Sequence, residues 1–153
     1  TPLYSSAASD VYKRQVCTVI QHPFSMIGTD GSAVAPYGVL GKGKPHPRSY
    51  GTFPRVLGKY VREERILKLE NAVRKMTSLP AQKLGLRDRG LVREGMYADI
   101  IIFDPEKVAD KASYADPHRY PEGIKYVLVN GRVTIDSGEH TGELSGKALR
   151  KRS

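Results

Sequence analysis

The first third of the chain contains two short apolar segments with the composition of buried β-strands. Val16–Ile20 is rich in β-branched residues, and Met26–Thr29 is an apolar run that ends in an Asp-Gly turn. A strand that is buried on both faces needs a neighbour on each side, because its backbone N–H and C=O groups must be paired. The later part of the sequence offers no obvious partner. We therefore expect a C-terminal fragment whose sheet is completed by chain that lies upstream.

Asp30 stands at the end of the second segment, between Gly28 and Gly31. If the segment is a strand, this acid lies at its C-terminal edge, where open α/β and barrel enzymes keep their catalytic groups. The glycines allow a sharp turn and the close approach of a substrate. Asp-Gly is also a common turn signal, so an ordinary turn is the alternative.

The composition argues against several classes of protein. The net charge is +9, which suggests nucleic-acid binding, but the basic residues lie among acids or in short loops and no aromatic residues alternate with them. No apolar stretch approaches the roughly 20 residues needed to cross a bilayer, and Thr1–Gln15 lacks the pattern of a secretory signal. Cys17 is the only cysteine, so no internal disulfide can form. We expect a cytoplasmic protein that binds neither nucleic acid nor a membrane.

Residues 1–15 differ in character from the rest of the chain. They show neither a strand period nor a helix period, and they resemble a translated adapter of the kind found at the ends of metagenomic reading frames. We expect a non-native or disordered leader with no fold of its own.

The middle of the chain predicts a loop followed by helices. Ser32–Phe53 is dense in Gly and Pro, and a loop of this length is usually functional or disordered. Apolar residues recur at helical spacing over Val56–Met76, after Pro54, which can open a first turn. A short helix should follow, beginning at Pro80 with Thr77 or Ser78 as its cap and ending at Gly85.

The remainder predicts β-structure. Gly95–Pro105 contains strong β-formers, and Tyr126–Ile135 reads as a hairpin around Asn130-Gly131, both of which tolerate positive φ. We expect a polar loop over Ala109–Gly123 between these strands. Asp99, inside the first strand, is expected to make a structural hydrogen bond.

Two stretches, Met26–Gly31 and His46–Leu57, resemble the N-acyl-D-amino-acid deacylases, or D-aminoacylases, of the amidohydrolase superfamily. Met76–Ala81, Arg93–Ile100 and the hairpin Val129–Val133 resemble the same proteins. The strand and the hairpin are widespread among amidohydrolases. The His-Pro-Arg loop is what indicates the D-aminoacylase branch.

This resemblance implies an α/β fold, the C-terminal part of a metal-dependent (β/α)8 amidohydrolase barrel plus part of a small β-sandwich. Residues 16–87 would be the end of the barrel, with its last strands, an active-site loop and terminal helices. Residues 88–143 would be the C-terminal part of the sandwich, and residues 144–153 a basic tail.

The resemblance also implies the chemistry. The substrate would be a small N-acyl-D-amino acid, hydrolysed at its amide bond by metal-activated water, with Asp30 as general base and acid. Zinc is the implied cofactor. Its main ligands would lie outside this chain, and Asp30 is a candidate ligand of a second metal. His46, Arg48 and Tyr50 are candidate substrate-binding residues, Arg48 for the carboxylate. The fragment alone should be inactive and unstable or prone to aggregate.

Two alternatives stay open at this stage. One is another amidohydrolase that acts on cyclic amides. The other is a non-catalytic, basic, β-rich module that binds an anionic partner. For Arg48 and Tyr50, the alternative is that they only hold the loop together. His22, His46, His118 and His140 show no metal-ligand spacing, so we expect ordinary loop histidines. His46 is the exception, because its loop could fold over the mouth of the barrel. The oligomeric state does not follow from the sequence.

Overall fold

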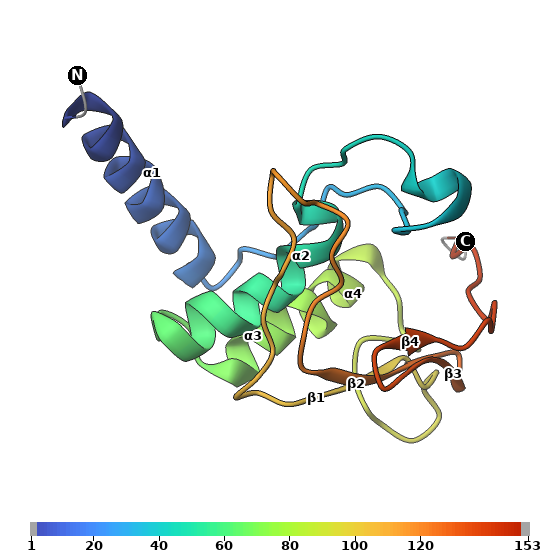
Figure 1. Cartoon of the computed structure of the whole chain (residues 1–153). Coiled ribbons are helices and arrows are strands. Elements are labelled where there is room, and N and C mark those ends of the chain that lie inside the picture. Colours follow the sequence, from blue (N-terminus) through green and yellow to red (C-terminus); the bar gives the residue numbers. More distant parts are fainter. Residues whose placement is uncertain (1–2, 151–153) are drawn as a thin grey trace.

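The computed structural model describes residues 3–150, with side chains from residue 11 onward. A long helix projects from a group of short helices, and a small antiparallel sheet lies beside that group (Figure 1). The helical elements are α1 (Leu3–Gln21), η1 (Gly38–Gly41), α2 (Arg48–Arg55), η2 (Val56–Glu63), α3 (Leu69–Met76) and α4 (Ser78–Leu84). The strands are β1 (Ile100–Phe103), β2 (Ile124–Val129), β3 (Arg132–Asp136) and β4 (Glu139–His140).

The start of the chain differs from the prediction. Val16–Ile20, predicted as a strand, lies within α1, and this helix also takes in Leu3–Gln15, which was predicted to have no fold of its own. Residues 1–2 lie outside the described residues. A β-branched residue lowers helix propensity by only a few tenths of a kcal/mol, roughly, whereas a strand without a partner leaves its backbone groups unpaired. The helix pairs those groups internally and brings Ile20 against the core.

The second predicted strand, Met26–Thr29, is not assigned to any regular element. Its exposure still alternates: Ile27 packs against the helical core, while Met26 is 41% exposed. The prediction that both of its faces are buried was therefore wrong for this structure. One face is covered by the helices, and within the described residues no strand pairs with it. Alternation of this kind is what a strand shows when one face is packed.

Lys75 of α3 holds this segment in place. Its side chain is 3% exposed, and its ammonium donates to the backbone oxygens of His22 and Ser25 and to the Ser25 hydroxyl, the last at 2.9 Å. The backbone oxygen of Lys75 accepts the N–H of Ile27 at 3.1 Å. Burial lowers the pKa of Lys75, and the charge of Arg74 acts in the same direction. The turn after α1 and the segment that leads to Asp30 are thus both tied to α3.

The predicted helix over Val56–Met76 is interrupted. α2 runs directly into η2, a π-helix, and the chain then breaks at Arg65, whose φ is 52°. Pro54 lies inside α2 rather than opening it. Gly58 lets η2 approach the segment between β1 and β2, since a Cβ there would lie 2.7 Å from the backbone oxygen of Val108. The predicted end of the next helix is confirmed, because Gly85 follows α4 with a φ of 74°.

The sheet is an antiparallel meander in the order β1-β2-β3-β4. β2 and β3 form the predicted hairpin, with Val129 opposite Arg132 and positive φ at both turn residues, 51° at Asn130 and 80° at Gly131. Two positive φ values give the two-residue turn whose twist matches that of the flanking strands.

Asp99 fastens this hairpin, as predicted. Its carboxylate accepts the backbone N–H of Asn130 at 2.8 Å and pairs with the guanidinium of Arg89. Arg89 also donates to the Asn130 side chain and lies over the ring of Tyr97, 4.3 Å from its centroid. Asp99 is therefore held by structural contacts at the hairpin.

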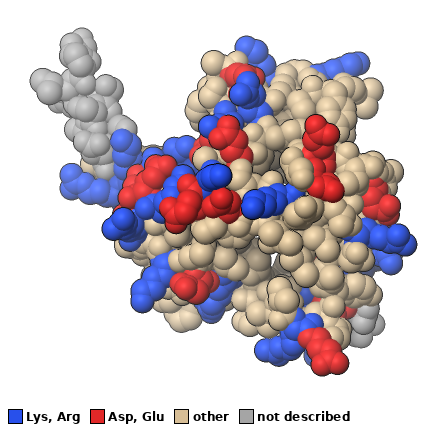
Figure 2. Space-filling view, turned by 60° about the horizontal axis from the view of Figure 1, so that its bottom comes forward, with Lys and Arg blue, Asp and Glu red and all other residues tan. Residues whose placement is uncertain are grey.

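The chain buries little of its apolar surface. Its accessible surface is 11270 Å², against about 7,700 Å² for a compact monomer of this mass. The core cluster of Val56, Leu67 and Ala72 lies among the helices, while Ile101 and Ile102 of the sheet are 55% and 48% exposed. Acidic and basic side chains are interspersed on the face seen in Figure 2. Within residues 3–150, no helix combines the length and the apolar character needed to cross a membrane.

The uncovered apolar surface predicts that the 153-residue chain associates with itself when it is expressed alone. We expect sedimentation velocity to show oligomers that grow with concentration, because burying apolar area between copies yields about 25 cal/mol per Å². A monomer at all concentrations, with a cooperative thermal transition, would contradict this expectation.

Replacement of Lys75 should destabilise the chain. In Lys75→Met, two backbone oxygens and a hydroxyl lose their donor, so we expect the free energy of opening that protects the Ile27 amide from hydrogen exchange to fall by about 2 kcal/mol. The matched control is Lys83→Met, which changes an exposed lysine of α4 and should shift the value by less than about 0.5 kcal/mol. Equal effects of the two substitutions would show that the Lys75 contacts contribute nothing.

Candidate active site

Asp30 lies in a tight turn that its neighbours define. Its φ of 46° is in the left-handed region, and the Thr29 hydroxyl accepts the N–H of Gly31 at 3.3 Å. A Cβ on Gly31 would stand 2.9 Å from the Cα of Ser49, so this glycine is required by the close approach of α2. The Asp30 side chain is 88% exposed. The turn therefore presents the carboxylate outward, on the side of the segment that the helices leave uncovered.

Arg48 is the ion-pair partner of Asp30. Its Nη2 stands 3.1 Å from the Asp30 Oδ2. Arg48 is the first residue of α2, and its backbone N–H donates to Nδ1 of His46 at 3.0 Å. The His46 ring therefore satisfies one of the free N–H groups at the start of this helix. Three of the predicted site residues, Asp30, His46 and Arg48, are thus joined by direct contacts.

Tyr50 faces a different neighbour. Its hydroxyl lies 2.9 Å from Nδ1 of His118, whose Nε2 lies 2.9 Å from the backbone oxygen of Gly43. Desolvation raises the pKa of Tyr50, so the phenol keeps its proton. The polar end of Tyr50 is therefore directed to the segment between β1 and β2, and the Asp30–Arg48 pair is formed without it.

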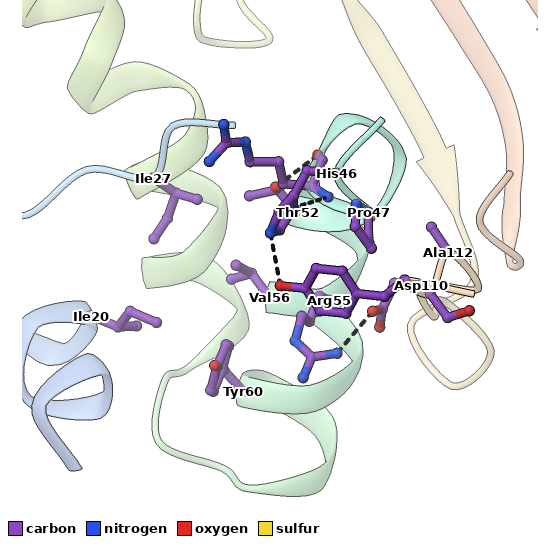
Figure 3. A pocket seen from close by; sticks show the side chains of 14 residues that line it. Ile20, Ile27, His46, Pro47, Thr52, Arg55, Val56, Tyr60, Asp110 and Ala112 are labelled. Atoms are coloured by element: carbon purple, nitrogen blue, oxygen red, sulfur yellow. Dashed lines mark hydrogen bonds and ion pairs between the residues drawn. The ribbon is translucent and has the colours of Figure 1, made fainter. Parts of the chain in front are cut away.

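A cavity of about 540 Å³ opens beside Arg48 and His46. Ile20 and Ile27 lie on one side of it, and Asp110 and Ala112 on the other (Figure 3). Within the cavity wall, Arg55 donates to Asp110 at 2.9 Å. Burial acts to lower the pKa of Arg55, but the hydrogen bond and charge of Asp110 outweigh it and raise that pKa. The wall of the cavity therefore contains the Arg55–Asp110 ion pair, whereas of the Asp30–Arg48 pair only Arg48 lines the cavity.

Sequence reasoning missed the residues that reach this site from the segment between β1 and β2. The Tyr114 hydroxyl lies 2.9 Å from Nε2 of His46, Asp110 pairs with Arg55, and His118 meets Tyr50. His118 was assigned to an ordinary loop, and Asp110 and Tyr114 were not singled out. Each of the two His–Tyr pairs spans 68 positions, so no local spacing could reveal them.

The other two histidines make short local contacts. Nδ1 of His22 accepts the N–H of Phe24 at 3.4 Å, and Nδ1 of His140 accepts the N–H of Gly142 at 2.9 Å. Both are turn contacts between residues two positions apart.

The described part of the chain does not by itself form a zinc site. Residues 3–150 contain no group of three or more His, Cys, Asp or Glu side chains placed to hold a metal ion. Zinc in proteins takes three or four such ligands. The exposed oxygens of Asp30 have the chemistry to supply one of them.

Comparison with known proteins gives consistent matches. The chain is 45% identical over 132 residues to N-acyl-D-aspartate deacylase of Alcaligenes xylosoxydans xylosoxydans, which covers 86% of this chain and 25% of that protein. A solved D-aminoacylase, described as having a binuclear metal centre activated by one metal and attenuated by the second, matches with a TM-score of 0.80 and 42% identity over 89% of this chain and 27% of the other.

A third match is N-acyl-D-glutamate deacylase of Bordetella bronchiseptica, solved with zinc and a phosphonate that mimics the tetrahedral intermediate. Its TM-score is 0.71 at 40% identity, over 87% of this chain and 27% of the other. The chain thus spans about a quarter of the length of these relatives. The predicted resemblance to the D-aminoacylases is confirmed. A model described as the amidohydrolase family also matches residues 12–135, which is most of the sequence, and the chain therefore belongs to the amidohydrolase family.

Proposed function

We propose that this chain works as part of a longer metal-dependent N-acyl-D-amino-acid deacylase. In that enzyme, residues 16–87 complete a (β/α)8 barrel and residues 88–143 form part of a β-sandwich. Two observations support this arrangement. The segment Met26–Thr29 has one face packed and no paired neighbour in the described residues, and the chain spans a quarter of its relatives' length. The missing chain would cover the apolar surface that is exposed here.

The single observation that carries the activity is the position of Arg48 beside Asp30. In an N-acyl amino acid, the carboxylate is two bonds from the amide nitrogen. A cation that binds the carboxylate must therefore lie next to the acid that transfers protons to and from the amide. The Nη2 of Arg48 is 3.1 Å from the Oδ2 of Asp30. Arg48 presents the planar fork that suits a carboxylate, and Asp30 presents an acid that can carry a proton.

In the proposed reaction Asp30 acts first as a general base and then as a general acid. A carboxylate oxygen of Asp30 takes a proton from the attacking water and returns it to the amide nitrogen as the bond to the acyl carbon breaks. The products are a free D-amino acid and a carboxylate. A bound zinc ion supplies the acidity of the water and the polarisation of the carbonyl. Its main ligands would come from outside this chain.

His46 and Tyr50 have supporting roles in this proposal. Nδ1 of His46 accepts a hydrogen bond from the backbone N–H of Arg48 and so fixes the orientation of the first turn of α2. Tyr50, whose hydroxyl is held by His118, would border the acyl group of the substrate. The chain is 45% identical to an N-acyl-D-aspartate deacylase, 40% to an N-acyl-D-glutamate deacylase and 42% to a D-aminoacylase. Because these three identities are similar, they do not indicate which D-amino-acid side chain the enzyme prefers.

The test needs a protein of the relatives' length, which we call the completed enzyme. It is made by extending the reading frame upstream, or by substituting this chain for the matching quarter of N-acyl-D-aspartate deacylase. With zinc present, we expect release of the amino acid from N-acetyl-D-aspartate, N-acetyl-D-glutamate or N-acetyl-D-methionine and none from the L-isomers. Activity on cyclic amides alone, or on neither class, would refute the proposal.

Substitution of Asp30 should abolish most of that activity. We expect Asp30→Asn to lower kcat by about 10²–10⁴-fold, because the amide can neither take the proton from water nor return it. The control is Asp136→Asn, the same change at an exposed acid of β3, which should leave kcat unchanged. A kcat within threefold of the parent in Asp30→Asn would remove this residue from the mechanism.

Substitution of Arg48 should act on substrate binding. Arg48→Lys keeps the charge and loses the fork, so we expect KM to rise about tenfold, equivalent to about 1.4 kcal/mol, with a smaller change in kcat. Arg65→Lys, at an exposed arginine in the break after η2, is the control. A fall in kcat with KM unchanged would mean that Arg48 does not bind the ground-state carboxylate.

A further inference from the structure

A segment of the β-region crosses to the candidate site. Residues 110–120, here called the strap, leave the sheet after β1, pass α2 and return to β2 (Figure 1). Asp110 at its start packs against α2, where a Cβ on Gly51 would stand 3.1 Å from the Cβ of Asp110. The same Asp110 accepts a hydrogen bond from Arg55 (Figure 3). The strap therefore lies directly on the helix that begins with Arg48.

Two histidine–tyrosine pairs join the strap to the start of that helix. The strap contributes Tyr114 and His118. The other two residues are His46, just before α2, and Tyr50, in the first turn of α2. The Tyr114 hydroxyl is 2.9 Å from Nε2 of His46, and the rings meet edge to face at 5.0 Å. The Tyr50 hydroxyl is 2.9 Å from Nδ1 of His118, with ring centroids 5.7 Å apart. Each side thus supplies one histidine and one tyrosine. We call these four residues the clasp.

The hydrogen bonds fix the proton positions in the first ring. Nδ1 of His46 accepts the backbone N–H of Arg48, so it carries no proton. The proton of the neutral ring is therefore on Nε2, which donates to the Tyr114 oxygen. The strap and the first N–H of α2 are thereby linked through a single imidazole.

In its neutral form, the second ring has the same tautomer. Nε2 of His118 faces the backbone oxygen of Gly43 and must donate to it. Nδ1 is then free to accept the hydroxyl proton of Tyr50. This ring joins Gly43, which precedes α2, and Tyr50, in the first turn of α2, to the strap. The raised pKa of Tyr50 keeps that hydroxyl a donor. A third tyrosine packs against Tyr50 edge to face: Tyr120, at a centroid distance of 5.7 Å.

We infer that Tyr114 and His118 are positioning residues for the Asp30–Arg48 pair. Through His46 and Tyr50 they hold the first turn of α2, and with it the Arg48 guanidinium, against the carboxylate of Asp30. The inference that this positioning serves catalysis rests on the proposed function. The β-region of the chain, which the sequence indicated only as a structural part, then contributes to the geometry of the site.

Hydrogen exchange of the backbone amides tests the clasp without reference to activity. The amides of Ser49, Tyr50 and Gly51 donate within the first turn of α2. In the completed enzyme, Tyr114→Phe removes one hydroxyl, and we expect these amides and that of Arg48 to exchange about fivefold faster. The matched control is Tyr126→Phe, a tyrosine of β2 outside the clasp, which should leave their exchange unchanged.

His118 offers a second variant with a conservative rescue. His118→Ala should also accelerate exchange in the first turn of α2. His118→Gln keeps one donor for Gly43 and one acceptor for Tyr50, so it should restore part of the protection. Unchanged exchange in both Tyr114→Phe and His118→Ala would overturn the proposal.

Kinetics separate the clasp from the reaction. We expect Tyr114→Phe to raise KM about fivefold, with a smaller change in kcat and an unchanged zinc content, because Arg48 is displaced while the metal ligands are not. Faster exchange with unaltered KM would overturn the positioning role. Faster exchange in an enzyme that hydrolyses no N-acyl-D-amino acid would refute the proposed function, while the clasp itself would stand.

Discussion

The buried ammonium of Lys75 is the interaction on which the rest of the structure depends. Its protons go to two backbone oxygens and one hydroxyl of the turn after α1. A buried charge is tolerated only when its hydrogen bonds are satisfied, so the turn and α3 determine each other's position. The segment after that turn carries Ile27 into the core and Asp30 out of it. The position of Asp30 therefore depends on Lys75, which lies far from it in the sequence.

The strap supplies the second constraint. Lys75 positions Asp30 from the helical side, and the clasp positions Arg48 from the sheet side. Both are polar contacts between segments far apart in the sequence. The core of the chain is small, so these contacts carry more of the organisation than in a compact domain of the same length.

The predictions that rest on positive φ were confirmed, whereas those that depend on packing failed. Two other local predictions were also wrong: Pro54 lies inside α2, and the Thr77 side chain makes no capping hydrogen bond to α4, which begins at Ser78. Asn130-Gly131 and Gly85 adopt positive φ for reasons contained in the residues themselves. Val16–Ile20 was predicted as a strand from its β-branched residues, but these favour a strand only weakly. Without a neighbouring strand to pair with, the segment is helical. The break at Arg65 and the π-helix before it follow from how the chain packs, and no periodicity in the sequence shows them.

The sequence by itself determined the family, and it predicted Asp30 and Arg48 as the central residues of the site. The motifs around Asp30 and Arg48 are short, and the types and order of their residues are enough to indicate their chemistry. Only the tertiary structure decided which groups stand around them. Tyr114 and His118 meet their partners across 68 positions, and Lys75 meets the turn across 50 or more. Contacts at such separation depend on how helices, turn and sheet pack together, because no repeating pattern in the chain encodes the distance between two side chains that meet only after folding.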